Sequence, residues 1–190
     1  MDNMKLNKTH LINLVQILII IVFFIIGFNF KPDGNTISST VLSMLTKVQT
    51  TDSLQNFIWL FTHNLMINFV IFWISYFSFG VIGTLWCISN TFMLGLLTKL
   101  YLTIIDNVWL ALLFMSLEFI AAIITMVSST SFRIEKFKLK KTFKYSLSGF
   151  DENYTSKKKK LERNILYVFG MVAVILFVAA ILETVVLGTI

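Results

Sequence analysis

The residue best suited to carry chemistry in this sequence is Glu118, a carboxyl group in the middle of a long apolar run. Leu117 and Phe119 flank it. Placing an ionisable side chain near the centre of a bilayer costs about 2.5–3.5 kcal/mol on insertion scales. A carboxyl group at such a position is therefore expected to have a structural or functional role. Glu118 could contact a partner, take up a proton or act as a conformational switch. It could equally be a protonated, hydrogen-bonded group that joins two helices.

Three amide side chains and a second carboxyl group share the apolar part of the sequence. Asn64 and Asn68 are four residues apart, so they lie on one face of a helix, and Asn90 follows in the next apolar run. We expect these amides to form hydrogen bonds across helices. Glu183 lies near the end of the last apolar run, where a carboxylate can reach water at modest cost.

The common catalytic and metal-binding motifs are absent from the sequence. Its two histidines, His10 and His63, are not part of a His-Glu-x-x-His motif, and its single cysteine, Cys87, cannot form a cysteine-based metal site. It has no Gly-x-Ser-x-Gly elbow and no nucleotide-binding glycine loop. We therefore expect a chain that is not an enzyme, with no cofactor and no metal ion. Any use of ATP would depend on a partner.

Glycines mark the places where the chain turns or where helices come close. Residues 57–105 contain one charged residue, Lys99, and are long enough for two spans, with a break at Gly80-Val81-Ile82-Gly83. Glycine permits the backbone geometry of a tight turn, so we predict a helical hairpin there. Gly80, Gly83 and Gly95 suit tight turns or close helix packing better than a ligand site.

The composition identifies the elements that must position these residues. Of the 190 residues, 56% are hydrophobic and 14% are charged, which is outside the range of soluble globular proteins. The apolar runs are long enough to cross a bilayer as helices. We predict a single membrane domain over residues 1–190, an all-α polytopic helical bundle with five spans near 11–28, 64–79, 84–102, 108–131 and 165–187.

Charge is concentrated in residues 132–164, which contain eleven of the sixteen basic residues and four of the ten acidic ones. The net charge of +6 is therefore local, and it indicates membrane topology and not a nucleic-acid surface. Basic segments stay on the cytoplasmic side, so we predict a cytoplasmic loop here, with the N-terminus inside and the C-terminus outside. The basic residues expected to contact a partner or lipid are Arg133, Lys136, Lys140, Lys141, Lys144, Lys157, Lys158, Lys159 and Lys160.

The basic stretch also contains an apolar stripe. Its members, which fall on one side of a helical wheel, are Phe132, Leu139, Phe143 and Leu147. An amphipathic helix lying on anionic lipid is one interpretation, since each nearby lysine contributes about 1 kcal/mol. A docking surface for a cytoplasmic partner and a solvated topology signal are the alternatives.

From Phe57 onward the sequence resembles the stage II sporulation protein M family of small integral membrane proteins. The resemblance lies in Asn64 after an aromatic-rich segment, in the hairpin at 79–84, in residues 90–95, in Glu118 with Ala121 and Ala122 following, and in residues 180–183. It implies a bacterial cytoplasmic membrane protein.

The resemblance implies two functional settings. One is a membrane scaffold that gathers peptidoglycan-remodelling proteins during sporulation engulfment. The other is a circular bacteriocin system, in which a small membrane protein works beside an ABC-type ATPase in peptide maturation, export or immunity. Because the basic stretch is large and the expected outer surface small, we favour a non-catalytic subunit of a peptide-handling or ABC-type transport assembly. The scaffold is the alternative, and a homo-oligomeric channel is the third candidate.

Overall fold

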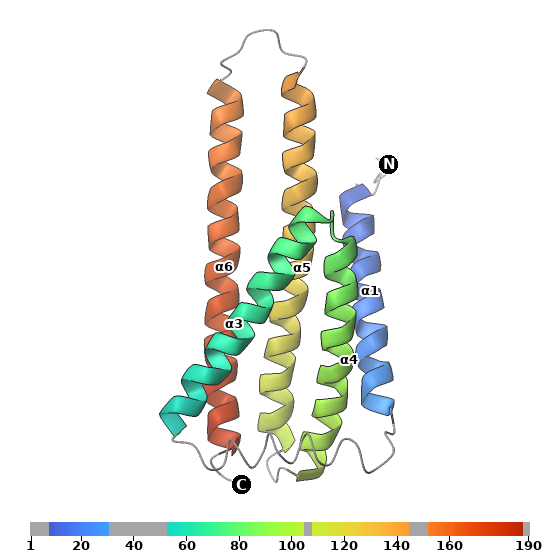
Figure 1. The fold of residues 1–190 in the computed structure, drawn as a ribbon, viewed down its shortest axis with the longest axis vertical. Helices are drawn as coiled ribbons and strands as arrows, with labels where there is room; N and C mark the ends of the chain where they lie inside the picture. The colour runs from blue at the N-terminus through green and yellow to red at the C-terminus, as the bar shows by residue number, and fades with distance from the viewer. Residues whose placement is uncertain (1–7, 31–52, 105–107, 145–151, 188–190) are drawn as a thin grey trace, which may run out of the picture.

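The computed structural model describes residues 8–30, 53–104, 108–144 and 152–187, which form helices and no strand (Figure 1). The five helices are α1 (Lys8–Asn29), α3 (Ser53–Phe77), α4 (Val81–Ile104), α5 (Val108–Lys144) and α6 (Glu152–Leu187). Each is long and apolar enough to cross a membrane. The predicted all-α polytopic bundle of five spans is therefore confirmed.

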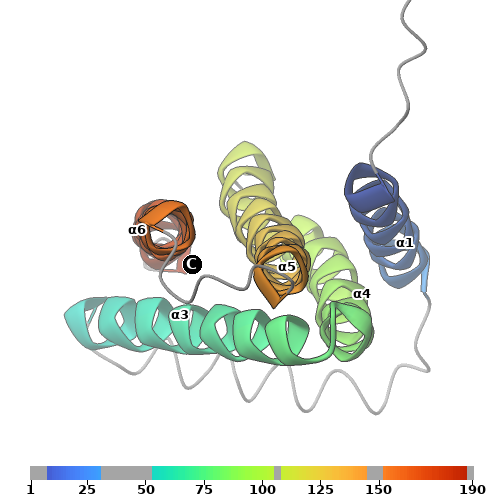
Figure 2. The same ribbon diagram turned by 90° about the horizontal axis from the view of Figure 1, so that it is seen from above.

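Helix α5 lies at the centre of the bundle and packs against each of the other four helices. Helix α1 packs mainly against α4, while α3 crosses obliquely over α5 and α6 (Figure 1). Seen from above, α3 runs along one side of the row formed by α6, α5 and α4 (Figure 2). Any residue on the inner faces of α5 thus meets a neighbouring helix and not lipid.

The start of α1 and the turn between α3 and α4 lie at the end of the bundle where α5 and α6 extend furthest (Figure 1). The end of α6 lies at the opposite end. Four spans lie between the start of α1 and the basic stretch, and this even number places both on the same side of the bundle. Which side faces the cytoplasm stays a prediction from the charge bias.

All the helices except α5 begin earlier than the apolar runs indicated. Helix α3 begins at Ser53 and not near residue 64, and α4 begins at Val81 and not near residue 84. Hydropathy locates the part of a helix that suits hydrocarbon, whereas backbone hydrogen bonding continues through polar turns at its ends. From its polar composition we expected residues 31–56 to form a loop on the outer face. Residues 31–52 lie outside the described residues, and residues 53–56 belong to α3.

The basic stretch at 132–164 is largely helical, although we expected a loop. Helix α5 continues to Lys144 and α6 starts at Glu152, so both helices project beyond the rest of the bundle (Figure 1). Adding residues to an existing helix avoids the cost of nucleation, and lysine, glutamate and leucine are good helix formers. We call residues 133–144 of α5 and 152–163 of α6 the basic extension; its α5 arm is about 18 Å long at 1.5 Å per residue.

An apolar seam joins the two arms of the basic extension where they leave the bundle. Phe132 and Leu161 are buried there, together with Phe72 of α3, and Leu139 packs against this cluster. Phe132 and Leu139 therefore face neighbouring helices and not a lipid surface, which does not fit the amphipathic helix interpretation. The stripe's remaining members, Phe143 and Leu147, lie outside the residues whose side chains are described.

The turn between α3 and α4 depends on two residues in the left-handed backbone region. Phe79 has a φ of 53° and Gly80 a φ of 88°, and the Gly80 N–H donates to the Ser75 carbonyl at 2.7 Å. Gly83 already belongs to α4. A Cβ atom there would lie 1.7 Å from the Ser75 Oγ, so Gly83 permits close packing of α3 and α4.

Two glycines allow α1 and α4 to approach closely. A Cβ atom on Gly95 would lie 2.3 Å from the carbonyl oxygen of Phe24, and one on Gly27 would lie 2.1 Å from the carbonyl oxygen of Phe92. Backbone atoms cannot rotate away as a side chain does. A side chain at either position would therefore push the two helices apart.

We predict that Gly95→Ala lowers the thermal unfolding midpoint of the purified protein in detergent. Overpacking of this kind costs about 1–3 kcal/mol. Gly170→Ala is the matched control, because Gly170 lies on α6 with no atom within 4 Å of the added Cβ. Equal midpoints for the two variants would contradict the close α1–α4 contact.

Candidate functional site

The inner face of α5 carries a stripe of polar residues that meets α3. Glu118, Thr125 and Ser129 are spaced by seven and four residues, which places them within about 40° on a helical wheel at 100° per residue. Thr125 and Ser129 are buried, and Glu118 is half-buried. Because α3 crosses this face, the polar groups of the two helices meet inside the membrane-spanning part of the bundle.

Asn64 and Asn68 of α3 connect this stripe into a network. The Asn64 amide donates a hydrogen bond from its Nδ2 to the Oε1 of Glu118. The Asn68 Nδ2 donates to the Asn64 carbonyl at 2.9 Å, and the Asn68 Oδ1 accepts a bond from the Thr125 Oγ1, also at 2.9 Å. We call Asn64, Asn68, Glu118 and Thr125 the α3–α5 network. It holds the tilted helix in register against α5.

Glu118 is the acidic member of the α3–α5 network. The Asn64 amide donates to one of its carboxyl oxygens, and a carboxyl group as a chemical type can also take up a proton or accept a further hydrogen bond. Among the described residues, no group of three or more histidine, cysteine or acidic side chains is arranged to hold a metal ion. Glu118 is the ionisable member of the α3–α5 network, whose other members are amides and a hydroxyl.

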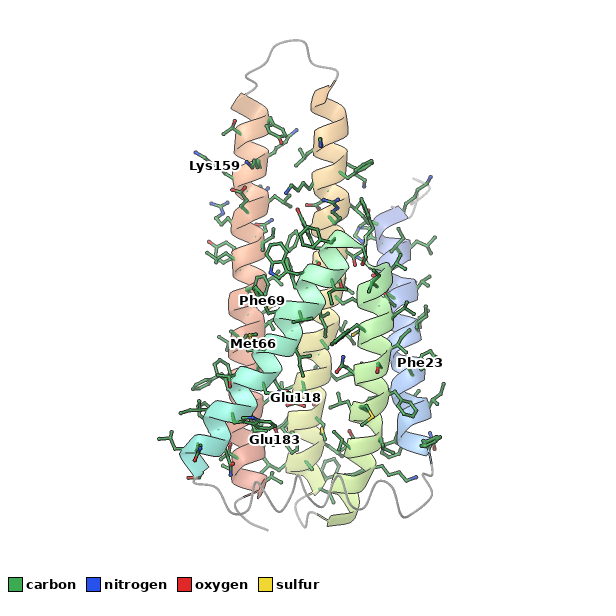
Figure 3. The ribbon with its side chains drawn as sticks, viewed as in Figure 1. Phe23, Met66, Phe69, Glu118, Lys159 and Glu183 are labelled. Carbon is green, nitrogen blue, oxygen red and sulfur yellow. The ribbon has the colours of Figure 1, made fainter. Side chains whose placement is uncertain are left out.

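Glu183 is more deeply buried than expected, with 7% of its surface exposed. We expected it to reach water near the end of α6. Instead, this part of α6 lies between two helices. Its Ala179 and Val186 pack in a buried cluster with residues of α5, and its Ala180 packs against Leu60 of α3. Figure 3 shows Glu118 and Glu183 in the half of the bundle far from the basic extension.

Asn90 is not part of the α3–α5 network. Its Nδ2 donates to the Trp86 carbonyl of its own helix at 3.0 Å, and no bond to another helix is found within the described residues. We expected a bond across helices. A half-buried amide at the surface of α4 can donate its hydrogen bond to a backbone carbonyl one turn earlier in the same helix. It therefore needs no acceptor on another helix.

A second polar network, which sequence reasoning missed, joins α1 to α4 and α5. The Gln16 Nε2 donates to the Thr84 Oγ1 at 2.9 Å and to the Thr130 Oγ1 at 3.4 Å. The Asn13 Nδ2 donates to the Ser131 Oγ at 2.9 Å. The available signal was the three-residue spacing of Asn13 and Gln16, which places two amides on one face of an otherwise apolar run.

The basic residues lie in two different environments. Lys136, Lys140 and the run 157–160 are exposed, and within the run Lys158 pairs with Glu162 at 3.8 Å. Arg133 is half-buried against aromatic rings. Lys159 lies on the projecting part of α6 and points away from α5 (Figure 3). The side chains of Lys141 and Lys144 are outside those described.

One further contact ties the basic extension to the start of the chain. The Lys138 Nζ donates to the Thr9 Oγ1 of α1 at 3.2 Å. Thr9 is buried, although it lies in the first turn of α1. The α5 arm of the extension is therefore held by α1 as well as by α6.

Five apolar helices joined by internal polar networks define a multi-pass integral membrane protein. The chain belongs to the stage II sporulation protein M family, whose model matches residues 14–186. This match confirms the resemblance and extends it over α1. No curated protein and no solved structure matches the chain.

We predict that Asn68→Leu destabilises the bundle more than Asn90→Leu does. Asn68 bonds to Thr125 across the helix interface, whereas Asn90 bonds within its own helix. Hydrogen bonds between membrane helices average about 0.6 kcal/mol and reach about 1.7 kcal/mol. Unfolding midpoints in detergent micelles measure the difference, and a larger loss for Asn90→Leu would contradict the network.

Proposed function

We propose that this chain is a non-catalytic membrane subunit of a peptide-handling or ABC-type transport assembly in the bacterial cytoplasmic membrane. In this assembly the basic extension docks a cytoplasmic partner. The observation that carries the proposal is the continuity of α5 from Val108 to Lys144, which makes the docking arm and the segment around Glu118 one helix.

The charge of the basic extension supports docking of an acidic partner. Successive residues of a helix are 100° apart, so Lys157, Lys158, Lys159 and Lys160 point in four directions around α6. Leu161 follows directly and is buried in the seam with α5. The run therefore sits on a fixed base, and a dense local charge speeds encounter with an oppositely charged surface.

The central position of α5 supports a coupling role. A force on the α5 arm acts on a helix that packs against all four others and carries Glu118. The sequence has no nucleotide-binding motif, so energy would have to come from the partner. A partner ATPase that shifts the basic extension could thereby change the environment of the membrane carboxyl group.

The scaffold for peptidoglycan-remodelling proteins is the second candidate, and the sporulation role in the family's description favours it. A channel is less well supported. Two of the predicted pore-lining amides are engaged inside the bundle, with Asn64 bonded to Glu118 and Asn68 to Thr125, and Asn90 donates within its own helix. A pore would have to form between copies of the chain.

The docking proposal is tested by replacing Lys157, Lys158, Lys159 and Lys160 together with glutamine. We expect recovery of an ABC-type ATPase with the tagged protein from native membranes to fall about tenfold, equivalent to 1.4 kcal/mol. Replacing the same four residues with arginine is the matched control, since it keeps the charge and should keep the partner. Undiminished recovery with the glutamine variant would refute docking through this run.

The identity of the recovered proteins separates the two candidate functions. An ATPase that depends on the lysine run supports the transport assembly. Cell-wall hydrolases recovered in its place would favour the scaffold and would shift attention to the opposite side of the membrane. Quantitative mass spectrometry of the material purified in mild detergent measures both.

Glu118→Gln tests whether the charge or the proton of this side chain matters. Glutamine has nearly the same volume and retains a carbonyl oxygen for the Asn64 amide, so we expect normal folding and normal partner recovery. Stimulation of the partner's ATP hydrolysis should fall at least tenfold if the carboxyl group takes part in coupling. Unchanged stimulation would restrict Glu118 to joining α3 and α5.

A further inference from the structure

Two basic side chains of α5 converge on the aromatic rings at the end of α3. The Arg133 Cζ lies 4.7 Å from the centre of the Phe79 ring and 5.3 Å from that of Tyr76. The Lys136 Nζ lies 5.4 Å from the centre of the Tyr76 ring. Cations at these distances are attracted to ring faces, so the rings hold both charges at one place on the bundle.

Phe79 holds its place in this cluster at a conformational cost. Its φ of 53° is in the left-handed region, which costs a residue with a side chain about 1–2 kcal/mol. Its ring packs edge-on against Phe137 of α5, with centroids 5.8 Å apart. A strained, bulky residue that presents its ring to an arginine is an outlier of the kind that accompanies functional sites.

Neither cation is neutralised within the described residues. No carboxylate there lies within ion-pair distance of Arg133 or Lys136, and the buried Nε of Arg133 has no hydrogen-bond acceptor. A buried donor without an acceptor costs about 1–3 kcal/mol, and more when it belongs to a charged group. An anion bound beside Arg133 would remove this cost.

The position of the cluster indicates the type of anion. Arg133 directly follows the buried Phe132, where α5 leaves its apolar run. Large apolar side chains close to the cluster in sequence are strongly exposed, namely Phe77, Val81, Ile82 and Phe137, with exposures of 67%, 65%, 56% and 56%. Exposed apolar residues beside clustered cations suit a molecule with both a phosphate and acyl chains.

We propose that Tyr76, Phe79, Arg133 and Lys136 form a binding site for the phosphate of an anionic phospholipid headgroup. The phosphate accepts hydrogen bonds from the Arg133 guanidinium and pairs with the Lys136 ammonium, while the acyl chains lie along the exposed apolar side chains. A lipid bound here joins the α3–α4 turn to α5 at the base of the basic extension. Arg133 and Lys136 belong to the α5 arm of the basic extension, whereas the lysine run that the docking test replaces belongs to the α6 arm.

The test uses the purified full-length protein in a neutral detergent with added phosphatidylglycerol, phosphatidylcholine or inorganic phosphate. We expect phosphatidylglycerol to raise the thermal unfolding midpoint, with little effect of the other two. The double variant R133Q/K136Q should bind phosphatidylglycerol at least tenfold more weakly. The matched control K158Q/K159Q loses the same charge and should bind as the unmodified protein does.

Three results would overturn the proposal. Equal weakening in the two double variants would mean general charge attraction, and an equal effect of inorganic phosphate would mean a free-anion site. Phe79→Leu provides a second route that keeps all charges, because it removes the ring face while retaining an apolar side chain at the same φ. Native mass spectrometry should show several-fold less retained phosphatidylglycerol with this variant, and full retention would also count against the site.

Discussion

A polar group inside hydrocarbon must find its partner within the protein, and most of this structure follows from how α5 meets that requirement. Glu118 and Thr125 face α3, and Thr130 and Ser131 face α1. Each pairing stabilises the contact between two helices by about 0.6 kcal/mol on average, and lipid offers no replacement donor or acceptor. The partners of α5 therefore define which helices surround it, and apolar packing fills the space between them.

The same helix connects the membrane interior with the charged part of the protein. Helix α5 continues without a break into the basic extension, where a seam with α6 and the Lys138–Thr9 contact hold it. The aromatic cluster around Arg133 lies at the junction of these two parts. The extension and Glu118 thus belong to one continuous helix, which is the physical basis for the coupling that we propose.

Sequence reasoning reached the membrane class, the five spans and the family, and it singled out Asn64, Asn68 and Glu118. It missed Asn13 and Gln16, because two amides in a first span have no obvious partner until α4 and α5 are placed beside them. It also predicted a loop at residues 132–164, which are largely helical, and a water-accessible Glu183, which is buried. Charge density does not reveal whether a segment is a loop or a solvated helix, and position near a helix end does not reveal what covers it.

The sequence by itself determined the number of spans and the place of the charge, because both depend on the transfer of local segments between water and lipid. Hydropathy and charge are properties of consecutive residues and need no partner. Only the tertiary structure decided which amide meets which carboxyl, that Glu183 is buried, and that Arg133 and Phe79 share one cluster. Those outcomes depend on helix tilt and rotation, which arise from packing among helices that are far apart in the chain.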